Sequence, residues 1–208
     1  MKYVIILLIL LIAIAGCVEP QKEEEITKIN IARHGAQVYE FSHNILDTLR
    51  DVPINDTETI KNVSDQSSTF NIIFDDLASP EEKARYSVVS YNIIIKLKTF
   101  YAYERGIALG EENFNSYYHS DGTWFYNEQE ILDANDENII DHLNTDQESI
   151  TIWLMGPDTG VEETSVEIED RIVYIKGKTG KEIEIAADRF ILAVFGFNDV
   201  EHFIQTIV

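Results

Sequence analysis

The sequence contains a single cysteine among its 208 residues, Cys17. Because no thiol follows that position, the rest of the chain can form neither a disulfide framework nor a zinc site built from cysteine thiolates. A folded region after Cys17 must therefore depend on its hydrophobic core. Hydrophobic residues make up 45% of the chain, which is enough for a sizeable core in one domain of mixed build or in two small ones.

Basic residues are also scarce, with 16 lysines and arginines against 37 aspartates and glutamates and a formal net charge of -21. Binding to nucleic acid draws its affinity from lysine and arginine placed against phosphates, so we expect no nucleic-acid partner. Anionic lipid headgroups would repel the same charge. Attachment to a membrane must therefore come from something other than surface charge.

Sequence motifs of common catalytic and metal sites are missing as well. There is neither an HExxH zinc motif nor a GxSxG nucleophile motif. Residues 133–137 resemble the start of a calcium loop, but Asn138 and Asn144 stand where that loop needs glycine and glutamate. Residues 156–160 lack the lysine and the backbone donors of a phosphate loop, so we expect a hairpin loop there. We assign no catalytic residue, no metal ligand and no cofactor.

The beginning of the chain has the pattern of an export signal. Lys2 supplies a basic start, residues 4–15 form an apolar run, and small residues precede Cys17. A membrane-spanning helix needs about 20 apolar residues, so this run is too short to span comfortably. We expect a signal peptide over residues 1–16.

Residues 14–17, Ile-Ala-Gly-Cys, resemble the lipobox of prokaryotic lipoproteins. The resemblance covers the leader only. It implies cleavage before Cys17, a diacylglyceryl group on its thiol, and a position at the outer face of the cell membrane of a bacterium or archaeon. Two acyl chains anchor a protein firmly, at about 0.8 kcal/mol per buried CH2. Residues 17–25 would then be a short acidic tether; an uncleaved anchor and ordinary secretion are the alternatives.

Apolar periodicity predicts a mainly helical region over residues 26–147. The predicted helices cover residues 26–51, 57–77, 80–109 and 128–143. Ser79, Pro80 and Glu82 form the best helix start, because they suit the N-cap, the first helical position and a capping box. The third helix is apolar on most faces in its middle, so we expect it to be the central packing element.

The pattern changes to alternation near residue 149 and predicts strands followed by short helices over residues 148–208. The strands are expected at residues 150–155, 165–169, 171–176 and 182–186, and the helices at 187–194 and 199–207. The resulting fold class is α+β, with N-terminal antiparallel helices followed by a small antiparallel β-meander and C-terminal covering helices. We expect both regions to pack as one domain.

Aromatic and polar residues gather in the segment 114–126. Flat rings give contact area and their polar tips orient a ligand, so this segment is a candidate ligand surface. Its residues are Tyr117, Tyr118, His119, Asp121, Trp124 and Tyr126. The alternative is that the rings pack the helices onto the meander, as large aromatic side chains usually do.

Two sequons, beginning at Asn55 and Asn62, fit the acceptor pattern for N-glycosylation. Both lie in or just after a predicted loop, which is compatible with exposure. They matter only in a host that glycosylates exported proteins.

Taken together, these features predict a non-catalytic binding or assembly module at the cell surface, with a protein, peptide or glycan partner. One alternative is a substrate-binding lipoprotein of a transporter, but helices followed by strands do not suit its alternating α/β lobes. The other is an envelope hydrolase that uses carboxylates. A pocket of converging Asp, Glu or His with shifted pKa values would favour the hydrolase, and a shallow aromatic surface would favour the module.

Overall fold

The computed structural model of the protein describes residues 27–31, 37–41, 43–75, 80–120, 122–132 and 134–207. The predicted signal peptide, Cys17, the tether and Asp121 therefore lie outside the described residues. None of the described helices combines the length and the apolar composition that crossing a membrane requires.

The centre of the fold is a seven-stranded sheet in the order β6-β5-β4-β3-β7-β9-β8. The four middle strands, β4, β3, β7 and β9, are parallel to one another, and the outer strands β5, β6 and β8 pair antiparallel. The strands are β3 (Thr69–Asp75), β4 (Phe114–Ser120), β5 (Thr123–Tyr126), β6 (Gln129–Glu130), β7 (Ser149–Met155), β8 (Ser165–Glu169) and β9 (Ile172–Lys176).

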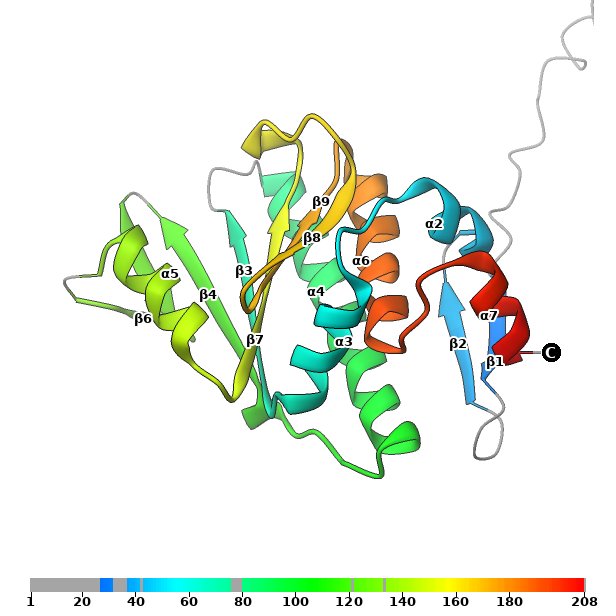
Figure 1. The fold of residues 1–208 in the computed structure, drawn as a ribbon. Helices are drawn as coiled ribbons and strands as arrows, with labels where there is room; N and C mark the ends of the chain where they lie inside the picture. The colour runs from blue at the N-terminus through cyan, green and yellow to red at the C-terminus, as the bar shows by residue number, and fades with distance from the viewer. Residues whose placement is uncertain are drawn as a thin grey trace, which may run out of the picture.

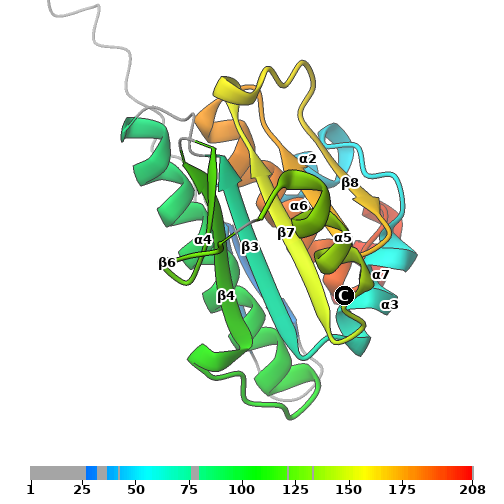
Figure 2. The same ribbon diagram turned by 90° about the vertical axis from the view of Figure 1, so that its left-hand side faces the viewer.

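Helices cover both faces of this sheet, but unequally (Figures 1 and 2). Among the described helices, α3 (Thr57–Gln66), α4 (Pro80–Glu104) and α6 (Gly180–Val194) cover one face, and α5 (Asp136–Thr145) covers the other. Short 3-10 turns precede β4 (η1, Glu111–Asn113) and follow β7 (η2, Pro157–Thr159).

A third layer packs on the far side of α6, and we call it the outer layer. It consists of the antiparallel hairpin β1 (Thr27–Ile31) and β2 (Gln37–Phe41) with the helices α2 (Ile45–Asp51) and α7 (Val200–Ile207). Phe41, Ile45 and Phe203 of this layer are buried against Leu192 of α6.

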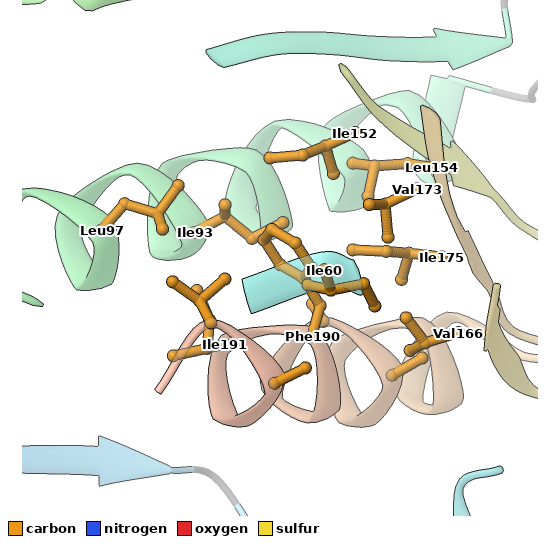
Figure 3. Close-up of a cluster of buried hydrophobic side chains, with 14 of the residues drawn as sticks. Ile60, Ile93, Leu97, Ile152, Leu154, Val166, Val173, Ile175, Phe190 and Ile191 are labelled. Atoms are coloured by element: carbon orange, nitrogen blue, oxygen red, sulfur yellow. The ribbon is translucent and has the colours of Figure 1, made fainter. Parts of the chain in front are cut away.

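The main core lies between the sheet and α3, α4 and α6, as Figure 3 shows. Ile152 and Leu154 of β7 and Val173 and Ile175 of β9 point toward these helices because alternate strand residues share a face. The helices contribute Ile60, Ile93, Leu97, Phe190 and Ile191 to the same core.

The predicted fold class is wrong, because the sheet is mixed, with a parallel centre and antiparallel edges, and begins within the supposed helical region. The predicted helix over residues 57–77 stops at Gln66, and residues 69–75 form β3 in the middle of the sheet. Phe70 and Ile72 are buried against α4 while Ile73 is buried under α5. A strand buried on both faces shows no alternation with polar residues, so its apolar spacing resembled that of a helix.

The predicted first helix is also wrong for most of its length. The described residues between 27 and 41 form β1 and β2, and only Ile45–Asp51 is helical, capped by the Asn44 side chain. Phe41, Ile45 and Leu49 do meet in one buried cluster. The strand β2 ends at Phe41 and α2 begins at Ile45, so the spacing of four spans two different elements. Periodicity in the sequence does not distinguish this arrangement from one continuous helix.

The aromatic segment, left without an element by the sequence, forms β4 and β5, and the next helix starts only at Asp136, capped by Asn135. The predicted strand over residues 182–186 is the first half of α6. Thr179 caps that helix by accepting from Glu182 N, and Ile183, Ala186 and Phe190 face the core at helical spacing. The meander is therefore absent: β7 and β9 are parallel neighbours, with β8 beyond β9.

Several local predictions are confirmed. The long helix α4 begins at Pro80 and packs against the centre of the sheet, although its predicted N-cap, Ser79, lies outside the described residues. Strands form at 149–155, 165–169 and 172–176, and α7 occupies the last predicted helix.

Candidate functional site

α5 buries only part of its face of the sheet. Its residues Ile139 and Leu143 pack on Ile73, Tyr117 and Trp124. The indole Nε1 of Trp124 donates to Asp136 Oδ1 at the start of α5, at 2.8 Å. Trp124 is only 3% exposed, so its ring is part of the surface on which α5 packs.

The predicted aromatic surface is divided by the alternation of β4 and β5. Tyr117 and Trp124 are buried under α5, and His119 stacks on Trp124 with ring centroids 5.2 Å apart. Tyr118 lies on the opposite face, stacked on Phe125 at 4.7 Å. Tyr126 is 37% exposed and donates its hydroxyl to Asn115. The five described residues of that prediction therefore do not form one surface, and Asp121 lies outside the described residues.

A different aromatic pair lies at the margin of α5. Trp153 of β7 and Tyr174 of β9 are direct partners in the parallel register, and their rings stack with centroids 5.8 Å apart and an interplanar angle of 28°. Trp153 also meets Trp124 edge to face at 6.3 Å. Both Trp153 and Tyr174 are half-buried. The strand alternation of residues 149–155 and 172–176 was the signal that placed each ring on a face, but only the pairing of β7 with β9 joins them.

A shallow hollow of about 320 Å³ lies just beyond this pair. It sits at the carboxyl ends of β7 and β9, the end of a parallel sheet where ligands commonly bind. Its lining comes from both strands, from β8 and from the loop between β7 and β8. The lining residues are Met155, Thr159, Gly160, Val161, Glu162, Glu163, Ser165, Glu167 and Lys176.

Three polar side chains of the hollow, Ser165, Glu167 and Lys176, bond to one another. Glu167 accepts from Lys176 Nζ at 2.6 Å and from Ser165 Oγ at 2.7 Å. These two hydrogen bonds lower the pKa of Glu167. Lys176 Nζ also lies 5.9 Å from the centroid of the Tyr174 ring. We call Trp153, Tyr174, Glu167, Lys176 and the adjoining hollow the aromatic site.

A second cluster of ionisable groups lies between α6 and the outer layer. Lys96 of α4 forms an ion pair and hydrogen bond with the buried carboxylate of Asp188 in α6. The His43 Nε2 atom lies 3.6 Å from Asp188 Oδ2, and the Lys96 ammonium lies 4.6 Å from the centroid of the Phe41 ring. Burial, partly offset by Lys96, raises the pKa of Asp188 to about 6. Burial and the charge of Lys96 lower the pKa of His43 to about 4.

A hollow of about 300 Å³ opens beside His43, between α2 and the first turn of α6. Lys181, Glu182, Asp47 and Asp51 also line it. A histidine with so low a pKa is a weak base at neutral pH, and the charge of Asp188 is already balanced by Lys96. We therefore interpret His43, Lys96 and Asp188 as a polar contact that fastens the outer layer to α4 and α6.

The two sequons differ in their surroundings. The Asn55 side chain extends the edge of β8: its Nδ2 donates to Ile168 O at 3.1 Å and its Oδ1 accepts from Ile168 N at 2.9 Å. Asn62 is exposed on α3. The amide nitrogen that a glycan would modify is thus already used by the fold at Asn55.

Within the described part of the chain, no group of three or more His, Cys, Asp or Glu side chains could hold a metal ion. Comparison of the chain with known proteins found no matching family model, no matching curated protein and no matching solved structure.

Proposed function

We propose that this protein is a lipid-anchored extracytoplasmic binding module whose ligand occupies the aromatic site. The observation that carries the proposal is the stacked, half-buried pair Trp153 and Tyr174 beside a hollow with a fixed Lys176–Glu167 ion pair. Ring faces bind the flat apolar faces of sugars and peptide side chains, and a few placed polar groups orient the ligand. The ligand class is therefore a peptide or glycan segment.

The chemistry of the hollow favours binding over catalysis. Both oxygens of Glu167 accept hydrogen bonds, and its lowered pKa makes it a weak general base. Lys176 is held by the same carboxylate and lies near a ring face. Groups fixed in this way orient a ligand without exchanging protons with it.

The mixed sheet removes one argument against a substrate-binding lipoprotein of a transporter, because from β3 onward helices are interspersed among the strands instead of all preceding them. Such proteins bind between two α/β lobes. The described residues build one seven-stranded sheet and one two-stranded hairpin, which do not make a second lobe. The hydrolase alternative has the hollow beside His43 in its favour, with its shifted pKa values. Because Lys96 already balances the charge of Asp188 beside that hollow, the hydrolase is the weaker proposal.

The substitution Trp153→Ala tests the aromatic site. Removing this ring should weaken binding about tenfold, because an aromatic anchor contributes on the order of 1–2 kcal/mol. Binding is measured against arrays of immobilised envelope glycans and of peptides. Tyr126→Ala, which removes an exposed ring of β5 outside the hollow, is the matched control and should leave binding unchanged.

Trp153 also packs against the α5 cluster, so folding needs a separate check. Lys176→Gln removes the ammonium of the site while leaving both rings, and it should reduce affinity with an unchanged thermal midpoint. Equal binding by wild type, Trp153→Ala and Lys176→Gln would reject the aromatic site as the ligand site.

A further inference from the structure

The long helix α4 has a second apolar face, which the fold leaves exposed. Its inner face includes Val89 and Ile93, which are buried in the main core. On its outer face Val88 is 54%, Tyr91 is 63% and Ile95 is 43% exposed. In Figure 2 the helix runs along the left margin of the molecule, with the sheet on its inner side. A helix that is apolar on opposite faces is normally buried on both, so this outer face is suited to a partner.

The outer face has the spacing of a coiled-coil seam. Its positions recur at alternating steps of four and three residues, which is the heptad repeat by which two helices pack along their length. Val88 and Ile95 are one heptad apart, and Tyr91 lies between them. We call these positions the α4 seam: Ala84, Val88, Tyr91, Ile95, Lys98 and Ala102.

Charge favours a second copy of this chain as the partner of the seam. The chain has a net charge of -21, so two copies repel each other over most of their surfaces. α4 carries four basic and three acidic residues, a net charge of +1. The other described helices are all net negative, at -1 in α2, α3, α6 and α7 and -3 in α5. A basic partner would be drawn to those helices, whereas an acidic second copy meets least repulsion at α4.

The seam is also complementary to itself. Val88 and Ile95 are nearly equally far from Tyr91, so a two-fold axis just after Tyr91 places Val88 of one copy against Ile95 of the other. In this antiparallel arrangement Lys98 lies opposite the small Ala84, and the two helix dipoles run in opposite directions. A parallel pair would bring the two Lys98 ammonium groups together.

We propose that the protein forms a homodimer in which the α4 seams of two copies pack antiparallel about a two-fold axis. The contact involves neither Cys17 nor the aromatic site. It is small, because the 25 residues of α4 make a face about 37 Å long and about 10 Å wide, on the order of 400 Å² per copy. A standard stable interface buries about 800 Å² per partner, so the dimer should be weak and its fraction should rise with protein concentration.

Single-cysteine variants of the full chain, purified in a mild nonionic detergent and oxidised, test this contact by non-reducing electrophoresis. Tyr91→Cys, next to the two-fold axis, should form a disulfide-linked dimer. Val88→Cys should form at most about one-fifth as much, because its two copies would lie about 10 Å apart along the helices. A mixture of Val88→Cys and Ile95→Cys should restore the crosslink. The unsubstituted protein, oxidised in parallel, measures any crosslink made by Cys17.

A matched control and a disruptive variant complete the experiment. Leu132→Cys places a thiol at a 78% exposed position outside α4 and measures crosslinking by random collision. Adding Ile95→Lys to Tyr91→Cys should lower the crosslinked fraction at least about fivefold, because it would bury an unpaired ammonium in the contact. Ile95 is 43% exposed, so the thermal midpoint of this variant should be unchanged.

Three results would overturn the proposal. Crosslinking of Tyr91→Cys no greater than that of Leu132→Cys would reject the homodimer. A Tyr91→Cys thiol that forms no dimer and also fails to react with a small maleimide would show that another segment of this chain covers the seam. Equal crosslinking of Val88→Cys alone and Tyr91→Cys would reject the antiparallel packing.

Discussion

At the scale of single residues, burial shifts the pKa values of His43 and Asp188 in opposite directions. Asp188 has a folded pKa of about 6, above its ordinary 3.8, so its contribution to stability is present at low pH and is lost as pH rises through 6. His43 has a folded pKa of about 4, below its ordinary 6.5, so its contribution is present above 6.5 and is lost as pH falls through 4. Lys96, Glu184 and Asp47 supply the neighbouring charges.

Between about pH 4 and 6 the two shifts oppose each other. In this range the unfolded chain carries one proton on His43, and the folded chain carries one on Asp188. The number of bound protons is then unchanged on folding, so this pair contributes little pH dependence to the free energy of unfolding. The free energy of unfolding should therefore vary little with pH in mild acid, although the ionisable pair is buried.

Single substitutions should reveal the two opposing slopes. Relative to wild type, His43→Gln should gain stability as pH falls from 6.5 to 4, and Asp188→Asn should lose it, each by at most about 1.4 kcal/mol per pH unit. Urea unfolding at several pH values measures both differences. His142→Gln, at an exposed position of α5, is the matched control. Difference curves of the same sign for the two variants would contradict the opposing pKa shifts.

At the scale of elements, the outer edge of β8 is closed by a loop. Asn55 N donates to Val166 O at 3.2 Å, Val166 N donates to Pro53 O at 3.0 Å, and the Asn55 side chain pairs with Ile168. An open strand edge can pair with another chain, so native proteins cover it. Here an asparagine amide takes the place of one further strand residue.

The substitution Asn55→Ala should therefore destabilise the fold by about 1–2 kcal/mol, because it leaves the N–H and C=O of Ile168 without their partners. Asn62→Ala, at the exposed sequon of α3, should change the unfolding midpoint little. Urea denaturation of the two variants gives the comparison. If Asn62→Ala lowered the free energy of unfolding as much as Asn55→Ala does, the amide contacts of Asn55 would not account for the loss of stability.

At the scale of the whole molecule, the proposed lipid determines where the protein acts. Cys17→Ser should abolish metabolic labelling with a radioactive fatty acid and move the protein from the membrane fraction to the soluble fraction. The firm anchoring by two acyl chains is the physical reason for so complete a change. Persistent labelling of the serine variant would contradict the lipobox prediction.

Local signals predicted several elements but not their assembly. Pro80 and Glu82 at the start of α4 and the alternation in β7, β8 and β9 depend on neighbours in sequence, and these elements are present. β3 was mistaken for a helix because both of its faces are buried. The parallel pairing of β3 with β4 and β7 joins segments far apart in the chain, and no local pattern encodes it.

The candidate site shows the same division. The sequence by itself determined the scarcity of basic residues and of cysteine, the aromatic content of residues 114–126, and the strands that carry Trp153 and Tyr174. Only the tertiary structure decided that Trp124 is buried under α5 while Trp153 and Tyr174 stack at its margin. The physical reason is that alternation fixes a side chain's face within its own strand, whereas burial depends on which distant strand and helix pack beside it.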